Sequence, residues 1–288
     1  MSKTRSSGPR DSVTVGVFLV LFSLVAQNIG ASFAKQLFVS VGAYGVAVLR
    51  ITLAALLLLA VRRPWTRPLS WQGMPILLGY GATLGLMNTL IYQAFARIPI
   101  GIAIGIEVAG PVMIGLVGAR RMRDFVWLGV VVTGLALLLP LRVGHSLDPV
   151  GMTCACGAGA CWALYIIFGK KVSAALGQDA VAWGMSVAAL ITAPLGLLFV
   201  GAPLFQPATL GIGLTVALLS SALPYSLEIK ALYMLPARAF GILVSTSPAI
   251  GAVTAYIILG ERLTMLQGIS ILCITAAAIG SVVTSRET

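Results

Sequence analysis

Apolar and polar residues alternate along the chain in one repeated pattern, with long apolar stretches separated by short segments carrying arginine, lysine, proline or glycine. A helix needs about 20 mainly apolar residues to cross the hydrocarbon core of a bilayer. The pattern therefore predicts an all-α integral membrane protein with ten transmembrane helices, near residues 13–34, 40–61, 73–95, 98–119, 124–141, 150–169, 180–201, 209–231, 238–259 and 264–284.

The composition agrees with a lipid environment. Hydrophobic residues make up 59% of the 288 residues and charged residues only 9%, and the mean hydropathy is +1.02. Because soluble domains carry about 25% charged residues, this chain has too little polar surface to cover a globule in water. A soluble enzyme, a nucleic-acid-binding domain and a secreted disulfide scaffold are thereby excluded, and we expect no nucleic-acid partner.

Residues suited to catalysis or metal binding do not form a recognisable group in the sequence. The single histidine, His145, falls in a connecting loop, and the four cysteines, Cys154, Cys156, Cys161 and Cys273, all lie in apolar runs. A tetrahedral zinc site needs convergent thiolates with partners such as histidine. We therefore expect inert thiols, no metal, no cofactor and no catalytic residue, and the protein is not expected to be an enzyme.

The net charge of +11 indicates how the chain is oriented in the membrane, because the basic residues are distributed unevenly over the predicted loops. With the N-terminus inside, fourteen lysine and arginine residues fall in cytoplasmic segments and four in external ones, namely Lys35, Arg97, Arg142 and Arg262. Cytoplasmic loops of membrane proteins carry an excess of basic residues. This bias predicts a multi-pass protein with both termini in the cytoplasm.

Proline spacing indicates an internal duplication. Pro99 and Pro111 are twelve residues apart, as are Pro236 and Pro248, and the two pairs are offset by 137 residues. Five spans per repeat would insert the halves in opposite orientation, which is typical of secondary transporters with a site near the bilayer midplane. The alternative is chance recurrence of prolines in membrane helices. The predicted organisation is a tail, two repeats and a second tail, at 1–12, 13–141, 150–284 and 285–288.

Two ionisable residues fall midway along predicted spans, Arg50 in the second and Glu107 in the fourth. Ionisable groups at that depth cost several kcal/mol unless they are paired or hydrated, so each is a functional candidate. Two interpretations of Glu107 stay open: an ion pair with Arg50 that locks two helices, and a cavity carboxylate that meets a substrate amine or a proton. For Arg50 the structural role is favoured.

Polar and aromatic residues recur at helical spacing in three spans. Tyr80, Asn88 and Tyr92 share one face of the third span, Trp162 and Tyr165 lie three apart in the sixth, and Tyr225 follows Ser221 and precedes Glu228 in the eighth. Aromatic residues also gather at membrane surfaces, which is the alternative explanation. A polar-aromatic lining suits a zwitterion, because its ammonium can make cation–π contacts. The predicted substrate-binding residues are Tyr80, Asn88, Tyr92, Glu107, Trp162, Tyr165, Tyr225 and Ser247.

Pro111 and Pro248 are predicted to interrupt their helices, since each removes a backbone hydrogen bond and frees a carbonyl group that must find another partner. Ser245, Thr246 and Ser247 directly precede Pro248. Such interruptions line cavities or serve as hinges for alternating access. We assign Arg50, Pro111 and Pro248 a structural or gating role.

Several segments resemble a known family. The ten spans, the five-plus-five repeat and the arginine of the second span resemble the drug/metabolite transporter superfamily of the EamA type. Within it, GAGACWALYI (157–166), ALPYSLEIKAL (222–232), LPARAFGILVSTSPAIGAV (235–253) and ILGERLT (258–264) resemble bacterial amino-acid exporters, nearest the threonine/homoserine exporters, with aromatic amino-acid exporters sharing the fold.

The resemblance implies export of neutral amino acids from the cytoplasm across the bacterial inner membrane, by alternating access around a central cavity. A range that extends to aromatic amino acids and methionine is open, as are proton coupling and uncoupled facilitated diffusion. Some exporters of the family have an acidic residue just before the proline of the second repeat, whereas this chain has Ser247. The alternative function is a multidrug or other metabolite exporter, and we expect a monomer to be functional.

Overall fold

The computed structural model describes residues 9–66, 73–98, 100–117, 121–138 and 148–251, together with 253, 265–266, 269, 272–273 and 276–277. Every element within these residues is helical. Six helices are long and apolar enough to cross a membrane: Val13–Ala31, Leu37–Arg62, Met74–Phe95, Pro149–Leu176, Asp179–Phe199 and Pro207–Met234. The predicted all-α membrane architecture is confirmed to that extent, while most of the predicted span 264–284 and part of 238–259 lie outside the described residues.

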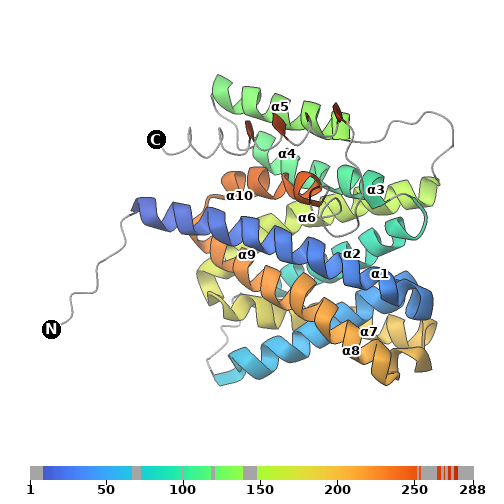
Figure 1. The fold of residues 1–288 in the computed structure, drawn as a ribbon. Helices are drawn as coiled ribbons and strands as arrows, with labels where there is room; N and C mark the ends of the chain where they lie inside the picture. The colour runs from blue at the N-terminus through green and yellow to red at the C-terminus, as the bar shows by residue number, and fades with distance from the viewer. Residues whose placement is uncertain are drawn as a thin grey trace.

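The first two predicted spans form one helical element, α1 (Pro9–Arg62), that is interrupted at Gly42. Gly42 has φ 64° and ψ −176°, a region of backbone space that is essentially restricted to glycine. The chain reverses direction there, as Figure 1 shows for the dark and light blue halves of α1. The sequence predicted a loop between residues 34 and 40, but the helix continues through that segment because only Gly42 releases the backbone.

Two further long helices are delimited by local sequence signals. α6 (Pro149–Leu176) begins after Asp148, whose carboxylate accepts a 2.9 Å hydrogen bond from the Val150 amide, with Pro149 in the first turn. Aspartate caps and first-turn prolines both favour a helix start. Gly177, with φ 55°, ends α6 before α7 (Asp179–Phe199) begins.

The core forms where α2 (Met74–Phe95) packs against α6 and α7. Glycine allows this close approach, because a Cβ at Gly184 of α7 would lie 2.2 Å from Cε1 of Tyr80, and one at Gly81 would lie 2.7 Å from the Gly184 carbonyl oxygen. Helices in membranes associate through such small-residue contacts, since lipid provides no hydrophobic drive between them. The glycine-rich composition therefore sets the spacing of the core helices.

Three predicted spans are irregular, since two are broken and one contains a π-helical turn. The fourth divides into α3 (Ile100–Glu107) and α4 (Ala109–Val117). The eighth contains α8 (Pro207–Ala217), a π-helical turn (Leu218–Ala222) and α9 (Leu223–Met234). The ninth begins with α10 (Ala237–Val244) and then turns at Ser245 and Thr246. Broken helices are tolerated at membrane depth only where protein or a cavity satisfies the freed backbone groups.

The remaining described elements lie at the periphery. α5 (Met122–Leu138) packs beside α4 at the edge of the bundle (Figure 1). Two short 3₁₀ turns, Pro64–Thr66 and Ala202–Phe205, follow the second half of α1 and α7. An ion pair of 3.5 Å between Arg97 Nε and Asp148 Oδ2 joins the end of α2 to the start of α6. Because both side chains are 38% exposed, this pair contributes little stability.

Candidate functional site: a buried polar cavity

A polar cavity of about 100 Å³ lies among these apolar helices. Since one water needs roughly 10–15 Å³ of such space, the cavity can hold several waters or a small polar molecule. Its walls come from α1, α2, α3, α6, the π-helical turn, α9 and the turn after α10. The lining residues are Gln27, Asn28, Ala31, Arg50, Met87, Asn88, Ile91, Tyr92, Phe95, Ile104, Glu107, Trp162, Ser220, Tyr225, Glu228 and Ser247.

Six of the eight predicted substrate-binding residues line this cavity: Asn88, Tyr92, Glu107, Trp162, Tyr225 and Ser247. The other two, Tyr80 and Tyr165, are fully buried and stack on each other with ring centroids 5.4 Å apart. Tyr165 also contacts Tyr225, at a centroid distance of 5.8 Å. The two tyrosines therefore lie behind the wall of the cavity and support it, because helical periodicity predicts the face of a residue but not its depth.

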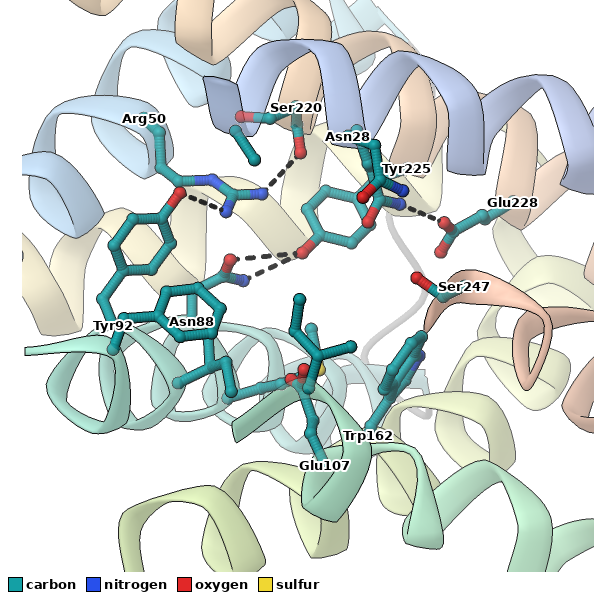
Figure 2. Close-up of a pocket in the computed structure, with 16 residues that line it drawn as sticks. Asn28, Arg50, Asn88, Tyr92, Glu107, Trp162, Ser220, Tyr225, Glu228 and Ser247 are labelled. Atoms are coloured by element: carbon teal, nitrogen blue, oxygen red, sulfur yellow. Dashed lines mark hydrogen bonds between the residues drawn. The ribbon is translucent and has the colours of Figure 1, made fainter. Parts of the chain in front are cut away.

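The Arg50 guanidinium occupies one side of the cavity, next to Tyr92 (Figure 2). Its Nη1 donates to the Tyr92 hydroxyl at 3.0 Å, its Nε donates to Ser221 Oγ at 2.9 Å, and its Nη2 donates to the Ser220 carbonyl. The guanidinium carbon also lies 5.3 Å from the centre of the Tyr92 ring. Both serine acceptors belong to the π-helical turn, which presents the Ser220 carbonyl and the Ser221 hydroxyl to the same guanidinium.

Asn88 and Tyr225 face each other in the middle of the cavity (Figure 2). Asn88 Nδ2 donates to the Tyr225 hydroxyl at 3.0 Å, and the Tyr225 hydroxyl donates to Asn88 Oδ1 at 3.3 Å. Nδ2 also donates to the Leu84 carbonyl at 2.8 Å. Both side chains are thereby held in fixed positions between α2 and α9.

Glu228 is the centre of a polar cluster that the predicted substrate-binding set did not include. Its carboxylate accepts hydrogen bonds from Gln27 Nε2 on one oxygen and from the Tyr165 hydroxyl at 2.9 Å on the other. The Ser23 hydroxyl lies 3.2 Å from the first oxygen and shares its one proton between Glu228 and the Val20 carbonyl, which is 2.7 Å away. The side chain is 1% exposed. These contacts tie α1 to α6 and α9, because Ser23 and Gln27 are on α1, Tyr165 is on α6 and Glu228 is on α9.

Gln27 and Asn28 of α1 were also missed as lining residues, since they lie inside an apolar stretch that was assigned only to spanning the membrane. Two adjacent amides in the middle of such a stretch are the signal that could have found them. The helical spacing of the eighth predicted span already placed Glu228 on the same face as Tyr225. That shared face is the signal that could have identified Glu228 as a lining residue.

Glu107 is positioned by an unusually close helix crossing. It is the last residue of α3, and a Cβ at Gly159 of α6 would lie 2.6 Å from the Glu107 carbonyl oxygen. At Gly110, the second residue of α4, an added Cβ would lie 1.8 Å from the Gly159 carbonyl oxygen. Glycine at both positions therefore lets the break between α3 and α4 rest on the backbone of α6.

The Glu107 carboxylate reaches the cavity without forming the ion pair that the sequence left open. The side chain is 8% exposed, lines the cavity, and makes no hydrogen bond or ion pair with any residue in the described part of the chain. Arg50 instead uses the neutral partners Tyr92, Ser220 and Ser221. Of the two interpretations of Glu107, the geometry favours the cavity carboxylate.

Apolar helices long enough to cross a membrane, with a small polar cavity among them, are typical of multi-pass membrane transporters. The EamA-like transporter family matches residues 149–283. The chain is 44% identical over 277 residues to the threonine/homoserine exporter RhtA of Escherichia coli (strain K12), covering 96% of this chain and 94% of the exporter. The chain belongs to the EamA-like transporter family.

Two other relatives and one solved structure are also similar to this chain. The threonine/homoserine exporter RhtA of Salmonella typhimurium (strain SL1344) is 43% identical over 276 residues, with 96% of this chain and 94% of the exporter covered. An uncharacterized transporter of Synechocystis sp. is 24% identical over 230 residues, or 75% of this chain and 67% of the relative. A crystal structure that covers 96% of this chain and 98% of its own has a TM-score of 0.78 at 15% sequence identity, which shows a common fold.

Proposed function

We propose that the protein is a secondary transporter that exports threonine, homoserine and related neutral amino acids from the cytoplasm. The observation that carries this proposal is the 44% identity, over nearly the full length of both chains, to an exporter of threonine and homoserine. The cavity supports it, because amide, hydroxyl, guanidinium and carboxylate groups face a space suited to a small polar solute. Under this proposal, the six predicted residues that line the cavity contact the substrate.

Two features support the two-repeat architecture as part of the proposal. The helix breaks at Val108 and at Ser245 are separated by 245 − 108 = 137 residues, the same offset as Pro111 and Pro248. Asn88 and Tyr225, which hydrogen bond to each other, are also 137 residues apart. Residues that contact their own equivalents lie near a symmetry axis. We therefore propose ten spans in two inverted repeats, with the cavity at their interface.

Alternating access is the proposed transport mechanism, with this structure in an outward-facing state. The α2 residues that line the cavity begin at Met87, in the second half of that helix, whereas Tyr80 in its first half is fully buried. With the N-terminus in the cytoplasm, as the excess of basic residues predicts, the second half of α2 is the external half. The stacked Tyr80 and Tyr165 then close the cytoplasmic side.

Lys170 of α6 would hold the cytoplasmic side closed. Its ammonium donates to the Leu232 carbonyl at 2.7 Å and the Leu235 carbonyl at 2.8 Å, at the C-terminal end of α9. Replacing Lys170 by methionine removes these bonds, worth about 1 kcal/mol for a partly exposed cation at a helix end. The inward-open fraction is expected to rise about fivefold, measured as faster alkylation of a cysteine placed at Ser173 in a background without native cysteines.

Lys171→Met is the matched control for this variant, because Lys171 is the exposed neighbour of Lys170 on the same helix. It is expected to leave the alkylation rate of the cysteine at position 173 at the wild-type value. Equal rates in both variants and in the parent protein would contradict a closing role for Lys170.

Counterflow in liposomes that contain only the purified protein tests the proposed function. Vesicles are loaded with unlabelled threonine, and uptake of external labelled threonine and homoserine is measured with and without a pH gradient. We expect uptake of both without a gradient, with labelled methionine and phenylalanine measuring the width of the range. Absence of uptake of every amino acid by folded protein would refute the proposal. Uptake of a labelled quaternary ammonium compound by the same vesicles would then favour the drug exporter, because the Glu107 carboxylate and the aromatic residues of the cavity suit an organic cation.

A further inference from the structure

Arg50 is a buried cation that forms no ion pair within 4 Å in the described part of the chain. The residue is 7% exposed, and its three hydrogen bonds go to two hydroxyl groups and one backbone carbonyl, all neutral. Ionisable groups inside a membrane protein are expensive and are usually paired with a counter-charge or face a hydrated cavity. Since Arg50 lines the cavity, its counter-charge can come from a ligand.

The guanidinium also retains donors for such a ligand. A guanidinium carries five N–H groups, and the three described hydrogen bonds use three of them. Tyr92, Ser220 and Ser221 fix the orientation of the group, so binding a ligand requires little further ordering of the side chain. A planar array of N–H donors matches the two oxygens of a carboxylate.

The two carboxylates of the cavity differ in their capacity for a ligand. Glu228 already accepts hydrogen bonds from Gln27 and Tyr165, and the Ser23 hydroxyl, which also donates to the Val20 carbonyl, lies 3.2 Å from it. Glu107 accepts none from the described residues, although it lines the same space. Glu107 is therefore the anion that is open to a ligand ammonium, and it stands apart from Arg50 by more than an ion-pair distance.

We infer that the cavity binds the backbone groups of a zwitterionic amino acid, with the α-carboxylate on Arg50 and the α-ammonium on Glu107. This inference rests on the proposed function and adds which groups of the substrate are recognised and where. It changes the expected role of Arg50 from a structural residue to a substrate-binding one. Each buried charge receives an opposite charge when the substrate is bound, and the side chain of the amino acid is left to the apolar part of the wall.

Ligands that lack one charge test the inference in the wild-type protein. Unlabelled threonine, threoninol and 2,3-dihydroxybutyrate compete with labelled threonine in the counterflow assay; threoninol lacks the carboxylate and 2,3-dihydroxybutyrate replaces the ammonium by a hydroxyl. Because hydrogen bonds to charged groups are stronger than neutral ones, each analogue is expected to compete about 10- to 100-fold more weakly than threonine. An analogue that competes as well as threonine overturns the corresponding contact.

Two variants assign each preference to its residue. Arg50→Gln is expected to reduce the difference between threonine and threoninol to less than threefold while keeping the difference between threonine and 2,3-dihydroxybutyrate, and Glu107→Gln is expected to do the reverse. If a variant fails to fold, the competition of the three ligands in the wild-type protein still decides whether the carboxylate and the ammonium are recognised. If wild-type protein shows no threonine counterflow, the proposed function fails; if it does and threoninol competes equally, only the role of Arg50 fails.

Discussion

Replacing Gly159 by alanine is expected to abolish amino-acid uptake and to lower the stability of the protein by about 3 kcal/mol, the upper end of the range for overpacked sites. The added Cβ would lie 2.6 Å from the Glu107 carbonyl oxygen. That neighbour is backbone, so no side-chain rotation relieves the clash, and α3 must move away from α6. Glu107 moves with it. Thermal unfolding of purified protein and threonine counterflow measure the two effects.

Gly211→Ala is the matched control, because a Cβ at Gly211 of α8 meets nothing within 4 Å. Alanine there is expected to be neutral or to stabilise the helix by about 0.5–1 kcal/mol. Wild-type uptake and stability in Gly159→Ala would contradict the close crossing of α3 and α6 and, with it, the placement of Glu107 in the cavity.

Replacing Glu228 by leucine is expected to lower the free energy of unfolding by about 2 kcal/mol and to reduce uptake strongly. The hydrogen bonds from Gln27 and Tyr165 and the shared one from Ser23 are lost, and such bonds between membrane helices average about 0.6 kcal/mol each. The donors Gln27 and Tyr165 would be left without this acceptor, whereas the Ser23 hydroxyl would still donate to the Val20 carbonyl. Because Ser23 and Gln27 are on α1, the contact of α1 with α9 weakens. Thermal unfolding in detergent and counterflow are the measurements.

Glu228→Gln separates hydrogen bonding from charge at the same position. The amide oxygen can accept from Gln27 and Ser23, and the amide nitrogen can donate to the Tyr165 hydroxyl, which rotates to accept. Its stability is expected to stay within about 0.5 kcal/mol of wild type. A leucine variant as stable as wild type, or a glutamine variant as unstable as the leucine variant, would argue against the cluster as a contact between helices.

The long spans could be predicted from sequence because hydropathy depends on composition over about 20 residues and needs no tertiary contact. Their interruptions could not be placed that way. The turn at Gly42 replaces a predicted loop, and the π-helical turn Leu218–Ala222 lies within a predicted uninterrupted span. Both depend on a single backbone conformation. Prolines gave a partial signal, since the break at Val108 precedes Pro111 by three residues.

The candidate site could be predicted in part for a similar reason. Spacing every three or four residues indicated inward faces in α2, α6 and α9, and Asn88, Trp162 and Tyr225 of these helices line the cavity. Depth within a face depends on which neighbouring helix covers the residue, so Tyr80 and Tyr165 lie behind the wall. Arg50 donates to Ser220 and Ser221 of the π-helical turn and forms no ion pair with Glu107. The sequence could not predict this choice of partners, because no local pattern indicates the π-helical turn.

The hydrogen-bonded pair Asn88 and Tyr225 has a consequence for motion in the proposed two-repeat architecture. In inverted repeats, the inward-facing and outward-facing conformations arise when the two halves exchange their shapes. A contact between equivalent positions is converted into itself by that exchange, so Asn88 and Tyr225 need not separate during the transport cycle. They would act as a pivot about which the helices tilt. The cavity would then open alternately on the external and the cytoplasmic side of this pair, while the pair itself keeps its contact.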